Sequence, residues 1–241
     1  MKFYTLITGA TSGIGLKTVL ELSPKHNLLV VGRSKKKLEH LKKSIGDEHL
    51  YFYCDLLDVD NIENNLSLYL KNNNALINKF ISCAGVDQNT PAKSLNSRSV
   101  NEMMKINFYS VIEIVSVLMK FSVNKASLKN IIFVSSISSI RGFKGKGAYS
   151  ASKGALDSYM RVISKEFAPR VVVNSVLPGA VHTPMSESTF QNADIVSHLN
   201  NIYPMGVGSV DKVVDCIKFY HDLENSWITG QQFVVDGGLT S

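Results

Sequence analysis

The sequence has few cysteines and no long apolar run. It contains three cysteines in 241 residues, and Cys54, Cys83 and Cys216 are far apart and without metal-ligand spacing. They are expected to be buried free thiols of a reducing compartment, so no metal site is predicted. The apolar run near Met1 is too short for a signal peptide, and no stretch approaches the roughly 18 apolar residues of a membrane span. A cytoplasmic protein with no membrane association is predicted.

The net charge of +6 is spread along the chain, which is not typical of nucleic-acid binding. The one lysine cluster alternates with leucine at helical spacing in KKKLEHLKK, a pattern typical of a solvated helix face. The charge therefore indicates a modest preference for anionic ligands and no nucleic-acid partner. The hydrophobic content of 44% suits a core of ordinary size, and no linker interrupts the chain, so one domain over residues 1–241 is predicted.

Short apolar, β-rich runs alternate with helical patterns throughout the chain. This alternation predicts an α/β fold with a doubly wound, mostly parallel sheet and helices on both faces. A long helix is expected over Ser99–Ser122, and the polar segment Met185–Pro204 is expected to be a mobile substrate loop. About seven strands are predicted, at Phe3–Thr8, Leu28–Val31, Leu50–Cys54, Leu76–Ser82, Ile131–Ser135, Val171–Val176 and Gln232–Val235.

The first predicted strand leads into a glycine-rich turn, Gly9-Ala-Thr-Ser-Gly13-Ile-Gly15, and a helical pattern follows. Strand, turn and helix are the context that a phosphate-binding loop requires. Glycines allow backbone N–H groups to approach a pyrophosphate, and the helix N-terminus adds a partial positive charge. The spacing is G-x-x-x-G-x-G, not G-x-G-x-x-G. A strand–helix turn without a ligand is the alternative interpretation.

No acidic residue follows the second predicted strand, which ends in Gly32-Arg33-Ser34. An acidic residue at this point accepts a hydrogen bond from the ribose 2′-hydroxyl of NAD, whereas an arginine accommodates the 2′-phosphate of NADP. NADPH is therefore predicted in preference to NADH. The alternative is that Arg33 is only a surface residue at the start of a helix.

Tyr149 and Lys153 are four positions apart, which places them on one face of the helix expected over Ala148–Phe167. An ammonium beside a phenol would lower the pKa of the tyrosine from about 10 towards the working pH of a proton-transfer catalyst. The pair alone is weak evidence, because both residue types are common on helix surfaces. Doubly wound folds bind ligands at the carboxyl ends of their strands. Several candidate residues share that edge: Gly9, Arg33, Asp55, Ala84, Ser136 and Pro178.

Together these motifs resemble the short-chain dehydrogenase/reductase family over essentially the whole chain. The resemblance implies a Rossmann-like oxidoreductase that uses NADPH to reduce a ketone to an alcohol. It rests on Thr8-Gly9-Ala-Thr-Ser-Gly13-Ile-Gly15, Asp55-Leu56, Ala84-Gly85, Asn107, Ser136, Tyr149-x-x-x-Lys153, Asn174, Pro178-Gly179, Thr183, Ile228-Thr229-Gly230 and Val235-Asp236-Gly237-Gly238.

The resemblance implies catalytic roles for four residues. Tyr149 would be the general acid, and Ser136 would hydrogen-bond the carbonyl oxygen. Lys153 would lower the pKa of the tyrosine and bind the nicotinamide ribose. Asn107 would hold a water that connects Lys153 to solvent, although an asparagine that caps or bends its own helix is the alternative.

Cofactor contacts are implied in the same way. Arg33 would meet the 2′-phosphate, Asp55 the adenine and Thr183 the carboxamide. The remaining implied contacts are Gly9, Thr11, Ser12, Gly13, Ile14, Gly15, Leu56, Ala84, Gly85, Tyr149, Lys153, Pro178, Gly179 and Val181. Ser82 and Cys83 depart from the asparagines common in the family, which puts local rigidity in doubt more than catalysis.

Within the family, the pattern is most similar to 3-oxoacyl-[acyl-carrier-protein] reductases, partly through the segment Pro204-Met-Gly-Val-Gly208. Arg170 would then meet an acidic carrier protein. Two alternatives stay open: a reductase or dehydrogenase of a sugar or other small-metabolite ketone, and a non-catalytic NADPH-binding regulator. The apolar stripes of the two long helices, with the resemblance, imply a homodimer or homotetramer.

Overall fold

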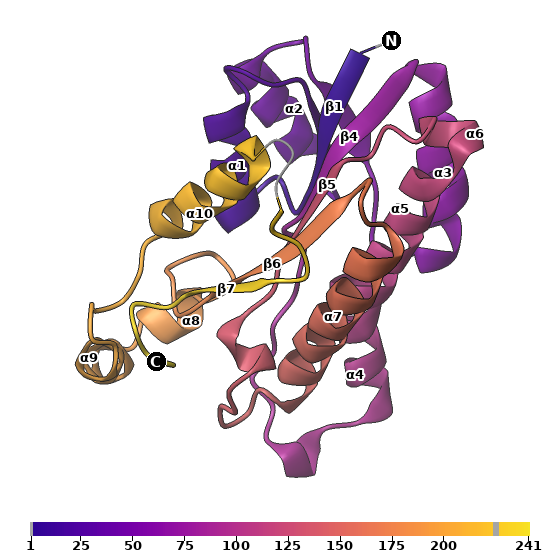
Figure 1. The fold of residues 1–241 in the computed structure, drawn as a ribbon. Helices are drawn as coiled ribbons and strands as arrows, with labels where there is room; N and C mark the ends of the chain where they lie inside the picture. The colour runs from indigo at the N-terminus through magenta and orange to yellow at the C-terminus, as the bar shows by residue number, and fades with distance from the viewer. Residues whose placement is uncertain (1, 224–226) are drawn as a thin grey trace.

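One sheet of seven strands runs through the structure, a computed structural model that describes residues 2–223 and 227–241 (Figure 1). Every pair of neighbouring strands is parallel, and the strand order is β3-β2-β1-β4-β5-β6-β7. The strands are β1 (Lys2–Thr8), β2 (Leu28–Gly32), β3 (Leu50–Tyr53), β4 (Ala75–Ser82), β5 (Asn130–Val134), β6 (Val172–Pro178) and β7 (Gln232–Val235).

Helices connect the strands. The α-helices are α1 (Gly13–Leu22), α2 (Lys35–Ile45), α3 (Val59–Asn72), α4 (Ser97–Met104), α5 (Ser110–Met119), α6 (Phe121–Asn124), α7 (Gly147–Glu166), α8 (Glu187–Phe190), α9 (Ala193–Ile202) and α10 (Val210–Asp222). Short 3₁₀ turns are η1 (Ala92–Ser94) and η3 (Ile137–Ser139), and η2 (Lys105–Tyr109) is a π-helical segment. None of the described helices is long and apolar enough to cross a membrane.

Two hydrophobic cores lie on opposite faces of the sheet. Helices α1, α2 and α10 cover one face, and α3, α5 and α7 cover the other (Figure 1). On the second face, Phe80 of β4 and Phe133 of β5 are fully buried, with ring centroids 6.3 Å apart. Burial of one such side chain contributes about 1.5–3 kcal/mol. The predicted α/β fold with helices on both faces is confirmed.

Two expected segments differ in the structure. The single helix expected over Ser99–Ser122 is wrong, because the π-helical η2 separates α4 from α5 and Lys120 has extended backbone angles that end α5. The segment Met185–Pro204 contains two helices, α8 and α9. Asn192 begins α9 by accepting a hydrogen bond from the N–H of Ile195, a capping signal that the sequence analysis did not use.

The C-terminal end of α10 is attached to the sheet by side chains. Asn130 of β5 donates to the carbonyl of Tyr220 at 2.7 Å, and Lys79 of β4 donates to the carbonyl of His221 at 2.6 Å. These bonds satisfy carbonyl groups that the end of a helix leaves without a partner. The buried His221 ring bonds Thr5 of β1 through Nε2 at 3.0 Å and Asp222 through Nδ1 at 2.7 Å.

His26, His221 and Asp222 also bring possible metal-ligand atoms within 4.8 Å of one another. Both ring nitrogens of His221 already have partners in the chain, and Lys79 places a positive charge nearby. We therefore assign this group to the attachment of α10.

We predict that His221 makes the fold sensitive to acid. Burial lowers the pKa of His221 from 6.5 to about 4. Between these values the unfolded chain binds a proton that the folded chain does not, so stability is lost as the pH falls. The loss due to His221 should be about 3 kcal/mol between pH 7 and pH 4. Denaturant unfolding at both pH values should show a correspondingly smaller loss of unfolding free energy in His221→Gln. The glutamine keeps a hydrogen-bonding side chain but does not titrate.

His40→Gln is the matched control, since His40 is exposed on α2. This variant should lose as much stability on acidification as the wild type. The prediction would be contradicted if the wild type and His221→Gln lost the same unfolding free energy between pH 7 and pH 4.

Candidate active site

The glycine turn after β1 lies at the point where the strand order reverses. The chain proceeds from β1 to β2 and β3 on one side, whereas β4 lies on the other side of β1, and such a switch point forms a crevice at the carboxyl ends of the strands. Gly9 has a φ of +63°, and a Cβ added to it would lie 2.7 Å from the Ala84 nitrogen. A Cβ on Gly15 would lie 2.3 Å from the carbonyl oxygen of Gly9. Only glycine fits at either position.

The N-terminus of α1 is suited to an anion. Ser12 is the N-cap residue, yet its side chain caps none of the described N–H groups of the helix. The first turn contains no acidic residue that would repel a phosphate. Free backbone donors, a helix dipole and closely packed glycines fit the pyrophosphate of a dinucleotide.

A cleft of about 140 Å³ opens beside this turn. It collects most of the cofactor contacts expected from the carboxyl ends of β1 to β4, namely Gly9, Thr11, Ser12, Arg33, Asp55, Leu56, Ala84 and Gly85. The sequence analysis did not assign Val31, Gly32, Cys54, Val86 and Ile106 to the cofactor, although they also line the cleft. Their signal was their position in the sequence, because each lies within two residues of a residue that was assigned.

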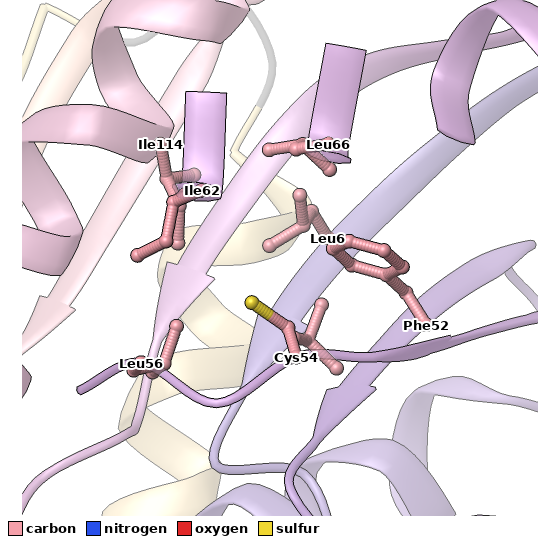
Figure 2. A pocket seen from close by; sticks show the side chains of 8 residues that line it. Leu6, Phe52, Cys54, Leu56, Ile62, Leu66 and Ile114 are labelled. Atoms are coloured by element: carbon pink, nitrogen blue, oxygen red, sulfur yellow. The ribbon is translucent and has the colours of Figure 1, made fainter. Parts of the chain in front are cut away.

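A second, much smaller cavity, drawn in Figure 2, shares Val31, Cys54 and Leu56 with the cleft. Its volume is about 10 Å³, and apolar side chains from β1, β3, α3 and α5 surround it. Figure 2 shows Cys54 and Leu56 at its edge, and both residues also line the larger cleft. A cavity of this size holds one water at most. The larger cleft is therefore the ligand site.

Two of the expected catalytic residues meet at Gly85. A Cβ added to Gly85 would lie 3.4 Å from Oδ1 of Asn107 and 3.5 Å from Nζ of Lys153. Lys153 is buried and donates a hydrogen bond from Nζ to the carbonyl of Val134 at 2.8 Å. Gly85 lines the cleft and has no side chain, so the Lys153 ammonium and the Asn107 amide lie close to the cleft.

Asn107 is fully buried in the π-helical η2. Its Oδ1 accepts from the N–H of Val86 at 2.8 Å, and its Nδ2 donates to the carbonyl of Val86 at 2.9 Å. Nδ2 also donates to the hydroxyl of Ser152 on α7 at 2.9 Å. The side chain therefore connects the loop after β4 to the helix of Tyr149, and it does not cap its own helix.

Tyr149 is close enough to Ser136 for the serine side chain to act on the phenol pKa, which it lowers. The Ser136 hydroxyl also accepts from the N–H of Ser138 at 3.1 Å. Burial raises the pKa of Tyr149 above its usual value of 10, and the negative charge of Asp87 adds to this effect. At neutral pH the phenol keeps its proton, as a proton donor requires.

The expected effect of Lys153 on the pKa of Tyr149 does not occur in this structure. The Lys153 ammonium is bonded to the Val134 carbonyl and lies 5.8 Å from the centre of the tyrosine ring. Burial also lowers the pKa of Lys153 from 10.5 to about 8. Desolvation of both side chains therefore dominates over their attraction.

The segment after β6 covers the glycine turn. A Cβ added to Gly13 would lie 3.4 Å from the Thr183 side chain, so Thr183 lies beside the N-terminus of α1. The Thr183 N–H and hydroxyl both contact the Ser186 hydroxyl, at 3.0 and 3.2 Å. The remaining expected contacts lie outside the residues that line the cleft, namely Gly13, Ile14, Gly15, Tyr149, Lys153, Pro178, Gly179, Val181 and Thr183.

Ile14 and Gly15 can offer only backbone groups to a ligand. The Ile14 side chain packs against the core under α1 and α10, as does Val181. Gly15 has no space for a side chain. This agrees with the expectation that the backbone of the turn meets a pyrophosphate.

Ser82 and Cys83, which depart from the family pattern, both pack against neighbouring elements. Ser82 is buried at the end of β4 beside Thr8 of β1. The Cys83 side chain contacts the hydroxyl of Thr18 on α1, and burial raises its thiol pKa to about 12. Such a thiol is unreactive at neutral pH. Cys83 therefore links β4 to α1.

Comparison with known proteins agrees with this geometry. The family model described as short chain dehydrogenase matches residues 4–194. The chain belongs to this family. The prediction of a short-chain dehydrogenase/reductase is thus confirmed, and the protein is an NAD(P)-dependent oxidoreductase of a family that acts on small carbonyl substrates.

Individual family members resemble the chain over nearly its whole length. It is 28% identical to human 3-oxoacyl-[acyl-carrier-protein] reductase over 236 residues, which cover 97% of this chain and 96% of that protein. It is 29% identical to glucose 1-dehydrogenase of Gluconobacter oxydans over 242 residues, which cover 98% and 91%. The structure of 4-hydroxyisoleucine dehydrogenase complexed with NADH has a TM-score of 0.89 at 25% identity, with 98% of each chain covered.

We predict that Tyr149→Phe removes turnover but leaves NADPH binding intact. The variant keeps the buried ring and loses only the hydroxyl that would donate a proton, which should lower kcat by about a thousandfold. NADPH oxidation measures the first effect, and fluorescence titration measures the second. Tyr159→Phe is the control, because Tyr159 is on the same helix and packs through its ring against Phe108 and Phe133. Activity retained by Tyr149→Phe would exclude Tyr149 from the chemistry.

Proposed function

We propose that the protein is an NADPH-dependent carbonyl reductase that converts a ketone to an alcohol, with Tyr149 as the proton donor. The observation that carries this proposal is the meeting of Lys153 and Asn107 at Gly85 beside the cleft, with Tyr149 one helical turn from Lys153 on α7. We also propose that residues 1–241 act as one cytoplasmic domain with a substrate segment at about 185–204. Its three free cysteines, all with thiol pKa values raised by burial, suit a reducing compartment.

In this mechanism, bound NADPH supplies the hydride. The Ser136 hydroxyl orients the substrate by donating to the carbonyl oxygen, where negative charge develops. Tyr149 gives its proton to the same oxygen and is kept protonated beforehand by burial. Lys153 provides positive charge near the nicotinamide ribose, and Asn107 holds the water that returns protons from solvent.

The cofactor is proposed to lie along the cleft at the carboxyl ends of β1 to β4. The backbone of the glycine turn and the N-terminus of α1 would hold the pyrophosphate, with Asp55 towards the adenine and Thr183 towards the carboxamide. Arg33 is exposed on the wall of the cleft, where its guanidinium suits a 2′-phosphate.

Two substrate classes are supported by different observations. Similarity to 3-oxoacyl-[acyl-carrier-protein] reductases supports a carrier-bound 3-oxoacyl group. However, the expected carrier contact Arg170 lies beyond the C-terminal end of α7, whereas Tyr149 is in the first turn of this helix. The C-terminal end of α7 is about 25 Å from Tyr149 along the helix axis. The second class is a sugar or other small hydroxylated ketone, supported by similarity to glucose 1-dehydrogenase and by a polar Asp87–Lys146 pair beside Tyr149.

The deciding experiment is an NADPH-oxidation screen against acyl-carrier thioesters, sugars and small ketones. Each activity is repeated with Tyr149→Phe, which separates turnover at this site from contaminating activity. Oxidation with any ketone that depends on Tyr149 supports the reductase. NADPH binding with no turnover across the whole screen would instead favour a non-catalytic regulator, which does not need Ser136, Tyr149, Lys153 and Asn107 together.

We predict that the wild type binds NADPH more tightly than NADH and that Arg33→Asp reverses this preference. The aspartate would repel the 2′-phosphate and accept a hydrogen bond from the free 2′-hydroxyl of NADH. Fluorescence titration with both cofactors measures the effect. Lys43→Asp makes the same charge change near the other end of α2 and should leave the preference unchanged. The prediction would be contradicted if the wild type bound NADPH and NADH equally well, or if Arg33→Asp kept the wild-type preference.

We also predict a homodimer or homotetramer. The apolar stripe of α5 is buried in the core of its own chain, so it does not support this prediction. Other apolar side chains are exposed, among them Phe121 (75%), Val162 (53%) and Phe219 (56%). Light scattering at micromolar concentration should give two or four times the chain mass of 26.6 kDa. A monomer under these conditions would refute the prediction.

A further inference from the structure

The loop after β4 places a carboxylate with one unpaired oxygen next to Val86, which lines the cleft. Asp87 lies two residues beyond Gly85, and its side chain is only 18% exposed. Its Oδ2 accepts a hydrogen bond from Nζ of Lys146 at 2.5 Å. Its Oδ1 is buried and receives no hydrogen bond from any residue that the structure describes. A buried carboxylate oxygen without a donor is unfavourable, so a donor from outside the chain would stabilise it.

The position of Asp87 is set by contacts on both sides. The side chain of Asn107 holds the N–H and the carbonyl of the preceding residue, Val86. On the other side, the N–H of Thr90 donates to the carbonyl of Gly145 at 2.8 Å, next to Lys146. Hydrogen bonds of the backbone on both sides therefore hold the loop that carries the carboxylate.

Asp87 is linked to the segment that carries the proposed proton donor. Its partner Lys146 immediately precedes α7, and Tyr149 lies in the first turn of that helix. Burial has the larger effect on the pKa values of Tyr149 and Lys153, and the charge of Asp87 acts to raise both. A substrate that presents its carbonyl oxygen to Tyr149 would bring its neighbouring carbons next to Asp87.

We propose that Oδ1 of Asp87 accepts a hydrogen bond from a hydroxyl group one or two carbons from the reacting carbonyl, so that the substrates are hydroxylated ketones. This inference rests on the proposed reductase function and names its substrate class. Lys146 already balances the charge of Asp87, which matches a neutral hydroxyl better than an ammonium group. A site built to bond a hydroxyl rejects an analogue that lacks it, because the buried acceptor is then left unpaired.

The test compares ketones that differ in one donor. Hydroxyacetone is paired with methoxyacetone, and 4-hydroxy-2-butanone with 4-methoxy-2-butanone. Each methoxy compound keeps the electron-withdrawing oxygen but cannot donate a hydrogen bond. The ratio of kcat/KM between the two members of a pair is measured by NADPH oxidation. In at least one pair, the wild type should favour the hydroxy compound by about tenfold or more, the value of one hydrogen bond to a charged group.

Variants at position 87 identify the acceptor. Asp87→Ala should bring the ratio close to one, mainly by slowing the hydroxy compound. Asp87→Asn keeps an acceptor oxygen and should retain part of the preference. Asp47→Asn is the matched control: Asp47 forms an exposed ion pair with Lys42, and its loss should leave the ratio unchanged. NADPH titration of each variant confirms that it is folded.

The outcomes separate this inference from the reductase function. Equal turnover of both members of each pair by the wild type, or an unchanged ratio in Asp87→Ala, overturns the inference and leaves the reductase standing. If the wild type reduces none of the four ketones, the inference is also overturned. In that case the broader ketone screen, with its dependence on Tyr149, decides whether the reductase proposal fails too.

Discussion

The contact between Gly9 and Ala84 is the constraint on which the candidate site depends. These residues follow β1 and β4, and the chain turns in opposite directions after the two strands. Their backbones are so close that no side chain fits at Gly9, and Gly15 then packs on the carbonyl of Gly9. This packing places the N-terminus of α1 beside the end of β4, and Gly85 follows at once. The anion site and the catalytic groups therefore share one edge of the sheet.

Burial controls the protonation of this edge more strongly than pairing does. Lys153 is buried and Tyr149 is partly buried, which favours the neutral form of each side chain. The phenol is accordingly a stable proton donor, and the ammonium is held by a backbone carbonyl instead of the phenol oxygen. A bound dinucleotide would add phosphate charges and hydroxyl groups to this environment. The protonation described for the chain alone is thus the starting state of a reaction.

Local patterns predicted the fold and much of the site, because strand ends, glycine turns and a tyrosine–lysine pair are encoded by nearby residues. Ligands bind at the carboxyl ends of the strands in such sheets, which predicted that Gly9, Arg33 and Asp55 lie together. In the structure all three line one cleft. What could not be predicted depends on contacts between distant segments. The pairing of Asp87 with Lys146 and the distance of Arg170 from Tyr149 are of this kind, since no short-range pattern encodes them.

The π-helical segment η2 has a consequence for the register of its helix. An α-helix turns by about 100° per residue, and a π turn includes one residue more than an α turn. Residues on α4 and α5 therefore do not share one continuous face, although each helix buries its own apolar residues. Deletion of one residue from η2 would restore a regular helix and rotate α4 by about 100° relative to α5. Asn107 would then no longer reach Val86, so the site depends on the number of residues in this helix as well as on their identity.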